Sequence, residues 1–320
     1  MGAHLVLQIV IFIFSFAVMW WASDKVIDYA IKTSKLFNVS TLFVGFIFIG
    51  FATALPEIAV VLTSAFDGIP EMAAGNIVGA NFNNLSLVLG IAAFWGNGLF
   101  VEKKCRNNLL FMILIITTIF AFVFGIGNLS FFHGLFLIGT YFFTLMWMWK
   151  NKSMVECETK EEKEIVVSKT LYDKLIVLFK FFLSVFVVLI AAELAVNRSE
   201  VISEMLHLSI TTFGATIFSI VTTVPELALS INAVRRNEHG IALGTLLGSI
   251  LPHLCLCLSF LTILSNQVIS LAKLMSFSWF IFSALLIISI SLWRQYKVGK
   301  VAGLLLLILF CISFIYHLLI

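Results

Sequence analysis

Long apolar runs, separated by short polar breaks, dominate this sequence. A helix that crosses a bilayer needs about 20 mostly apolar residues. Ten runs come close to or exceed this length: 5–22, 40–66, 73–98, 109–125, 131–149, 175–196, 209–234, 241–264, 274–293 and 301–319. Because the apolar positions are continuous and do not alternate, they indicate helices and exclude a transmembrane β-barrel. The pattern predicts an all-α polytopic membrane protein with ten transmembrane helices.

The composition agrees with a chain embedded in lipid. Hydrophobic residues make up 61% of the 320 residues and charged residues 12%, whereas soluble domains carry about 25% charged residues. The net charge is only +3, with the basic residues in short scattered clusters, which argues against a nucleic-acid partner. The five cysteines have neither CxxC nor zinc-finger spacing, so they imply no disulfide framework and no structural zinc.

The basic residues predict an orientation in the membrane. Seventeen Lys and Arg residues lie in the loops after the odd-numbered runs, and two lie in the loops after the even-numbered runs. Since cytoplasmic loops carry the excess of Lys and Arg, we expect both termini outside. The loop 150–174 is a solvated linker in our interpretation; a calcium-sensing role is weaker because its acids lack the spacing of a calcium loop. It is too short for regulatory domains, which favours a prokaryotic plasma membrane.

An internal repeat divides the chain at a constant offset of 169 residues (226 − 57). The segments 52-ATALPE-57 and 75-GNIVGANFNN-84 correspond to 221-VTTVPE-226 and 244-GTLLGSILPH-253. Each half holds five predicted spans, and this odd number makes the second half enter the membrane from the opposite side. Inverted repeats of this kind are typical of secondary transporters. We expect a first five-helix repeat at 1–149, the linker at 150–174 and a second, inverted repeat at 175–320.

Two acidic residues lie deep within apolar spans, at equivalent positions of the two repeats. A charge at the bilayer centre costs at least about 2.5–3.5 kcal/mol, so Glu57 and Glu226 indicate a site near the midplane where a cation or protons separate the two carboxyl groups. Pro56 and Pro225 precede them and should break each helix just before the glutamate. Carboxylate, hydroxyl and carbonyl oxygens together suit hard cations.

Polar residues in the second element of each repeat point to the same cavity. Gly75-x-x-x-Gly79 and Gly244-x-x-x-Gly248 have the spacing that lets helices approach closely. Asn84 and His253 each follow their glutamate by 27 residues (84 − 57 and 253 − 226). We expect the other five histidines, near span ends, to be solvated, and Asp24 and Glu193 to be interfacial anchors or, alternatively, groups on a cation path.

These motifs resemble the α-repeats of the calcium/cation antiporter superfamily, the sodium/calcium exchangers, and the resemblance covers both halves. It implies the ten-helix inverted-repeat exchanger fold, with Glu57 and Glu226 as Ca²⁺ ligands and spans 1 and 6 sliding to switch access. By motif position, it implies oxygen donors at Thr53, Thr222, Thr223 and Ser249, and a polar group beside the central site at Asn84.

The sequence departs from the family pattern at four positions. Ala54 and Ala80 stand where the family usually has hydroxyls, and Thr245 stands where Asn is common. His253 stands where Asp or Asn is usual, and its imidazole, with an ordinary pKa of about 6.5, is neutral or positive. His253 is therefore either a polar packing residue or a modulator of coupling that also favours softer ions such as Mn²⁺ or Zn²⁺.

The resulting hypothesis is a secondary antiporter that exchanges a divalent cation, first of all Ca²⁺, against Na⁺ or H⁺ by alternating access. The alternatives are a cation channel, a transition-metal/proton exchanger on the same fold, and a non-transporting sensor. No GxSxG, HExxH or P-loop occurs, so we expect neither an enzyme nor a cofactor. The expected partners are small cations and the lipid bilayer, and we expect the chain to act as a monomer.

Overall fold

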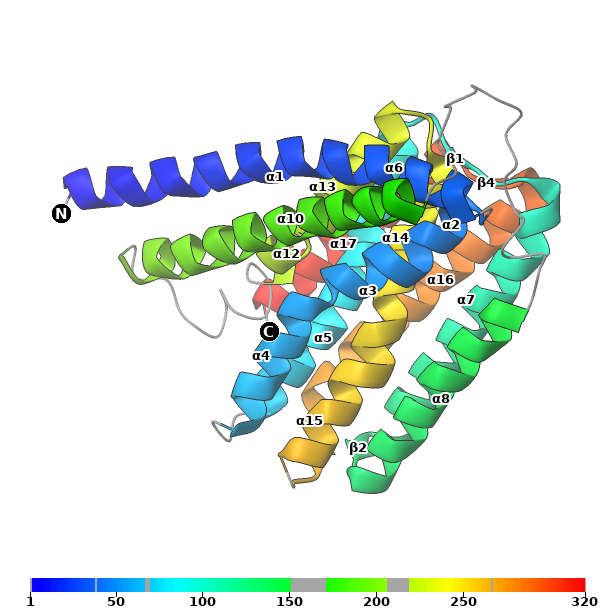
Figure 1. Ribbon diagram of the computed structural model, residues 1–320. Coiled ribbons are helices and arrows are strands. Elements are labelled where there is room, and N and C mark those ends of the chain that lie inside the picture. Colours follow the sequence, from blue (N-terminus) through cyan, green and yellow to red (C-terminus); the bar gives the residue numbers. More distant parts are fainter. Residues whose placement is uncertain are drawn as a thin grey trace.

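The computed structural model describes residues 2–37, 39–66, 70–150, 171–205, 219–265 and 267–319. Most of these residues are helical (Figure 1). The α-helices are α1 Gly2–Phe37, α2 Thr41–Val44, α3 Gly50–Thr53, α4 Leu55–Phe66, α5 Pro70–Asn83, α6 Leu89–Trp95, α7 Lys103–Ile126, α8 Phe131–Lys150, α10 Leu171–Met205, α12 Ser219–Thr222, α13 Val224–Arg235, α14 His239–Pro252, α15 Leu258–Leu264, α16 Met275–Gln295 and α17 Lys300–Leu319. The other elements are the π-helical turns η1 Gly45–Ile49, η2 Asn84–Val88 and η4 His253–Cys257, the 3₁₀ turn η5 Ala272–Leu274, and the strands β1 Leu99–Phe100, β2 Asn128–Leu129, β3 Ile269–Ser270 and β4 Lys297–Val298.

Within the described residues, nine helical stretches are long and apolar enough to cross a membrane. They coincide with nine of the ten predicted spans. The remaining prediction, 209–234, begins outside the described residues and continues as α12 and α13. Two helices are much longer than predicted: α1 runs on to Phe37 and α10 to Met205. Charged residues end an apolar run but not a helix, and no Gly or Pro interrupts either extension.

The two halves repeat the same elements at the same offset. Adding 169 to the bounds of α4, α5, η2 and α6 gives the bounds of α13, α14, η4 and α15, and α8 maps onto α17 in the same way. Two short antiparallel sheets join the halves, because β1 pairs with β4 and β2 with β3. The repeat predicted from the sequence is therefore a structural repeat.

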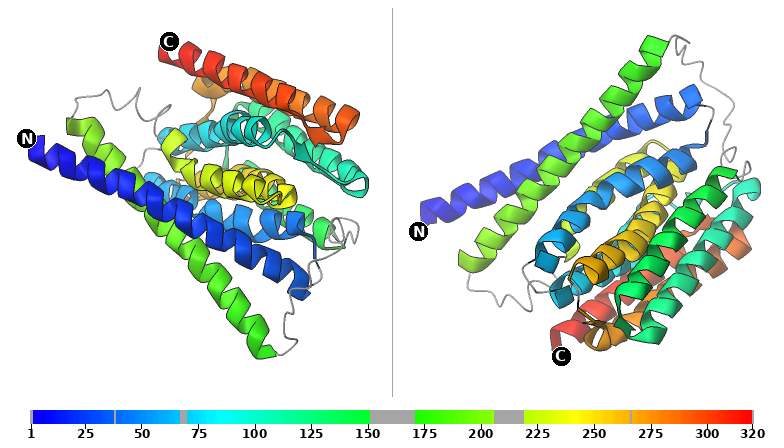
Figure 2. Two further views of the ribbon diagram at one scale, coloured as in Figure 1. Left: turned by 90° about the horizontal axis from the view of Figure 1, so that it is seen from above. Right: turned by 60° about the horizontal axis from the view of Figure 1, so that its bottom comes forward.

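The helices form an inner group and an outer pair. α1 packs along α10, and together they cross one side of the other helices (Figure 2). The stretches Ala73–Trp95 and His239–Leu264 are the most buried of the candidate spans. Both carry predicted site residues, so the site lies in the interior of the helical bundle and away from the lipid.

Glycines let the backbones of the two halves touch. A Cβ atom on Gly50 would lie 2.5 Å from the carbonyl carbon of Gly248, and one on Gly45 would lie 2.8 Å from the carbonyl oxygen of Ile241. The predicted packing role is thus confirmed for the second Gly-x-x-x-Gly pair. On Gly75 a Cβ would meet, among the described residues, only a side-chain atom of Leu274 at 3.9 Å, which is ordinary contact.

One cysteine departs from expectation. Cys105 is disulfide-bonded, while Cys255, Cys257 and Cys311 are free. Spacing along the chain reveals local cysteine motifs only, and it does not report a pairing made by the fold.

Candidate cation site

A break in each of two helices positions the buried acids. α3 ends at Thr53 and α4 begins at Leu55; in the other half, α12 ends at Thr222 and α13 begins at Val224. Ala54 and Thr223, which join the pieces, have φ, ψ of −83°, −6° and −87°, 2°. The following proline has no N–H to donate to the preceding turn, so the helix restarts there. The predicted breaks are confirmed, and each glutamate falls in the first turn of the new helix.

The two glutamates meet His253 in one cluster. Ligand atoms of Glu57, Glu226 and His253 all lie within 4.8 Å of one another, and Nε2 of His253 is 3.7 Å from Oε2 of Glu57. All three side chains are at most 1% exposed. None of their carboxylate oxygens or ring nitrogens has a hydrogen-bond partner. Buried polar atoms without a partner cost free energy. A bound cation would remove this cost, so the cluster has the properties of a cation site.

Two equivalent π-helical turns place the next polar groups. Asn84 is the first residue of η2 and His253 the first residue of η4. Nδ2 of Asn84 donates to Oγ of Ser249 at 3.1 Å, which joins the two halves, and Oδ1 of Asn84 is buried without a partner. π-helical turns are rare and are frequently found at functional sites. Pro252 removes one backbone hydrogen bond of the α-helix just before His253. Asn83 stands at the equivalent position before Asn84, so the two turns share no common signal in the sequence.

The predicted hydroxyl donors lie at the breaks but are turned toward their own helices. Thr53 donates to the carbonyl oxygen of Gly50 at 3.2 Å, Thr222 to Ser219 at 3.1 Å, and Thr223 to Ile220 at 2.9 Å. Because these bonds use the hydroxyl hydrogen, the oxygen lone pairs stay free to bind a cation. The Thr53 hydroxyl also lies beside the Glu226 carboxyl group of the other half.

Further buried polar groups lie outside the set of predicted ligands. Side-chain atoms of Asn76, Asn81, Ser230 and Thr245 are buried without a hydrogen-bond partner. Three of them lie on α5, which leads directly into Asn84, and on α14, which carries Ser249. These residues could have been selected from the sequence because each is a polar residue within an apolar span. Together they form a polar lining of the bundle interior.

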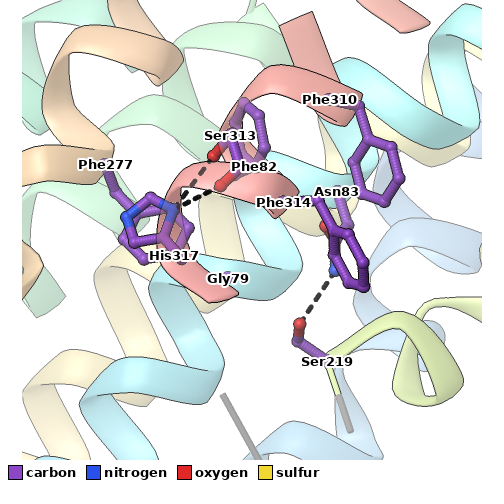
Figure 3. Close-up of a pocket in the computed structure, with 9 residues that line it drawn as sticks. All are labelled: Gly79, Phe82, Asn83, Ser219, Phe277, Phe310, Ser313, Phe314 and His317. Carbon is purple, nitrogen blue, oxygen red and sulfur yellow. Dashed lines mark hydrogen bonds between the residues drawn. The ribbon is translucent and has the colours of Figure 1, made fainter. Parts of the chain in front are cut away.

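A separate small cavity lies where α5, α12, α16 and α17 meet (Figure 3). Its volume is about 20 Å³, which is room for a single water molecule. None of the predicted site residues lines it. His317, expected to be solvated, is instead half-buried there and stacks on Phe277 with ring centroids 3.9 Å apart. Its Nδ1 lies 2.8 Å from the carbonyl oxygen of Ser313, and since that oxygen can only accept, Nδ1 carries the hydrogen.

An ion pair ties the outer helix pair to the bundle. Nε of Arg236, in the turn between α13 and α14, donates to Oδ1 of Asp24 on α1 at 2.9 Å, and the same guanidinium pairs with Asp28. Nδ2 of Asn232 donates to the carbonyl oxygen of Trp20 at 3.1 Å nearby. Asp24 therefore joins α1 to the bundle through Arg236, whereas Glu193 is exposed.

Replacing Arg236 by Gln should loosen this attachment. The ion pair is partly solvated, with side chains 30% and 41% exposed, so we expect a loss on the order of 1 kcal/mol. For a chain of this size that corresponds to about 1–2 °C in apparent melting temperature, measured by thermal unfolding in detergent. Arg294→Gln, at an exposed site, is the control, and an equal effect of both substitutions would contradict the anchoring role.

Comparisons with known proteins agree with this architecture. The family model described as sodium/calcium exchanger protein matches residues 7–150 and 176–319. A membrane protein of Methanocaldococcus jannaschii is 30% identical over 247 residues, which cover 77% of this chain and 78% of that protein. The sodium/calcium exchanger MaX1 of Methanosarcina acetivorans is 23% identical over 287 residues, covering 74% and 77%.

A solved structure has the same fold. The sodium-calcium exchanger NCX_Mj, soaked with 10 mM Na⁺ and without Ca²⁺, superposes with a TM-score of 0.81 over 97% of this chain and 98% of that chain, at 24% identity. The protein is a polytopic membrane transporter and not an enzyme. It belongs to the sodium/calcium exchanger family.

Proposed function

We propose that the protein is a secondary antiporter that exchanges a divalent cation, in the first instance Ca²⁺, against Na⁺ or H⁺. The observation that carries this proposal is the buried cluster of Glu57, Glu226 and His253, whose ligand atoms lie together without hydrogen-bond partners. Two carboxylates supply two negative charges, which balance one divalent ion, two Na⁺ or two protons. Ions of either kind therefore compete for one site, and this competition couples their movements.

The other predicted site residues supply further oxygen ligands for the cation. Thr53, Thr222 and Thr223 offer hydroxyl oxygens at the helix breaks, and Ser249 and Asn84 lie at the contact between the halves. Hard cations such as Ca²⁺ and Na⁺ take oxygen ligands of these kinds. We assign all five as cation ligands or their immediate neighbours, with His253 as a modulator of coupling.

Alternating access fits the arrangement of the helices. Helices α1 and α10 pack mainly against each other and cross the bundle as a pair (Figure 2). This pair can therefore shift while the site helices stay packed. We propose that this pair moves between the outward-open and inward-open states. The proposal keeps both termini outside, a prokaryotic plasma membrane, a monomer, and the division into 1–149, 150–174 and 175–320. The two matched ranges, 7–150 and 176–319, support that division.

Counterflow in proteoliposomes tests the exchange. Vesicles loaded with Na⁺, or with acidic buffer, should take up ⁴⁵Ca²⁺ from an external solution that lacks the counter-ion, and uptake should stop when the gradient is collapsed. A cation channel would conduct without stoichiometric counterflow, and a non-transporting sensor would bind the ion without flux. Either result would refute the antiporter.

A charge change at His253 should alter the coupling. His253→Asp adds a carboxylate beside Glu57, and a third negative charge favours additional Na⁺ ions at the site. We expect ⁴⁵Ca²⁺ uptake to depend more steeply on the Na⁺ gradient in this variant. Cys257→Ser, in the same π-helical turn, is the control, and an unchanged Na⁺ dependence in His253→Asp would refute the role of His253 in coupling.

A further inference from the structure

His253 brings a nitrogen ligand into an otherwise oxygen-rich site. Its Nε2 lies 3.7 Å from Oε2 of Glu57, and its ring is fully buried. Neither nitrogen has a hydrogen-bond partner. Buried polar atoms in proteins are normally hydrogen-bonded. Because the two nitrogens of His253 are not, both are available to bind another ligand.

The repeat explains why the imidazole is unsatisfied. Subtracting or adding 169 maps Asn84 onto His253 and Ser249 onto Ala80. By the repeat, the bond from Asn84 to Ser249 would correspond to a pairing of His253 with Ala80, and alanine has no hydroxyl to accept or donate. The lost hydroxyl releases the imidazole, which lies toward Glu57 instead.

The same repeat suggests a fourth donor. By the repeat, the contact of His253 with Glu57 would correspond to an approach of Asn84 to Glu226, and Oδ1 of Asn84 is buried without a partner. Two carboxylates, one imidazole and one amide oxygen then make up the donor set. Ca²⁺ takes six to eight oxygen ligands, and this chain has lost candidate hydroxyls at Ala54 and Ala80, both fully buried.

We propose that this site binds a late first-row divalent ion, of which Zn²⁺ is the representative, more tightly than it binds Ca²⁺. The ligands are Nε2 of His253 and one carboxylate oxygen each of Glu57 and Glu226, with Oδ1 of Asn84 completing four. Imidazole is a preferred ligand of Zn²⁺, and few, close ligands suit it better than Ca²⁺. The inference rests on the proposed function, because it names the cargo of the same site.

The observed spacing fits such an ion after a small contraction. Zinc bonds of about 2.0–2.2 Å in a tetrahedral site place two ligand atoms about 3.4 Å apart. The contact between His253 and Glu57 is 3.7 Å, and the three ligand atoms lie within 4.8 Å of one another. We expect rotation of the two carboxyl groups to supply the remaining movement.

Cobalt absorption tests metal binding independently of transport. The purified full-length protein, carrying an affinity tag free of histidine, is titrated with Co²⁺, whose visible absorption reports bound nitrogen and oxygen ligands, and the bound ion is then displaced by Zn²⁺ or Ca²⁺. We expect Zn²⁺ to displace Co²⁺ at a concentration at least tenfold lower than Ca²⁺. His253→Asn should weaken Co²⁺ binding at least tenfold, whereas His133→Gln and Cys257→Ser should leave it unchanged.

His253→Asp keeps the test decisive if the asparagine variant does not fold. This variant places an acid, one of the two residues usual in the family, at this position, and it should prefer Ca²⁺ over Zn²⁺. The inference is overturned if the unmodified protein prefers Ca²⁺, or if His253→Asp and His253→Asn both retain its preference for Zn²⁺. Zn²⁺ binding without counterflow of any ion would refute the antiporter and leave the metal site; counterflow without a preference for Zn²⁺ would do the reverse.

Discussion

Glu57→Gln and Glu226→Gln are each expected to abolish ion exchange. Glutamine preserves the size of the side chain and removes its negative charge. Both carboxylates are buried and lie within one cluster of ligand atoms, so either change leaves a bound divalent cation with one uncompensated charge. Removal of one partner from a buried charge pair costs about 3–5 kcal/mol, which weakens cation binding by about 10²–10⁴-fold. The initial rate of ⁴⁵Ca²⁺ counterflow measures the effect.

A matched control separates the site from general loss of charge. Glu193 lies on α10 and is exposed, so Glu193→Gln should retain exchange at the level of the unmodified protein. Each variant must first elute from size-exclusion chromatography as the unmodified protein does. Full exchange in both Glu57→Gln and Glu226→Gln would refute the assignment of the cluster as the cation site.

Gly248→Ala should destabilise the protein strongly, although it adds only one methyl group. The new Cβ would lie 2.6 Å from the Cα atom of Phe46 and would also clash with the carbonyl oxygen of that residue. Both are backbone atoms, which cannot rotate away as a side chain can, so α14 must move from the first half. Overpacking of this kind costs about 1–3 kcal/mol or more. We expect a lower apparent melting temperature in detergent, followed by the fluorescence of the native tryptophans.

Gly139→Ala provides the comparison. Gly139 lies within α8, and nothing stands within 4 Å of the Cβ that alanine would add. Alanine is favoured over glycine inside a helix by about 0.5–1 kcal/mol, so this variant should melt at the same temperature or higher. A similar decrease in both variants would mean that the effect of Gly248→Ala does not come from the contact with Phe46.

The sequence predicts the positions of the acids and the helix breaks well, because both follow from local chemistry. Proline at 56 and 225 cannot donate to the preceding turn wherever the chain folds, and a buried acid is costly in any apolar span. The constant offset then pairs Glu57 with Glu226. The cluster of these two acids is therefore predictable from one sequence without knowledge of the contacts.

Features that depend on contacts between distant residues are not predictable in this way. The approach of His253 to Glu57 joins residues 196 positions apart (253 − 57), and the anchoring of Asp24 requires Arg236 from the other half. The π-helical turns at Asn84 and His253 follow different residues, asparagine in one half and proline in the other. They arise from the packing of the two halves, so a local pattern gives no sign of them.

The short sheet between β1 and β4 has a consequence for how the protein is made. Leu99 pairs with Val298, across 199 positions (298 − 99), so the backbone groups of β1 wait for a partner until almost the whole chain has left the ribosome. The two halves insert into the membrane one after the other, but the short strands of each half pair only with strands of the other half. The fold is therefore completed only after both halves have been synthesised. A truncated product would have unpaired strand edges, which promote aggregation and degradation.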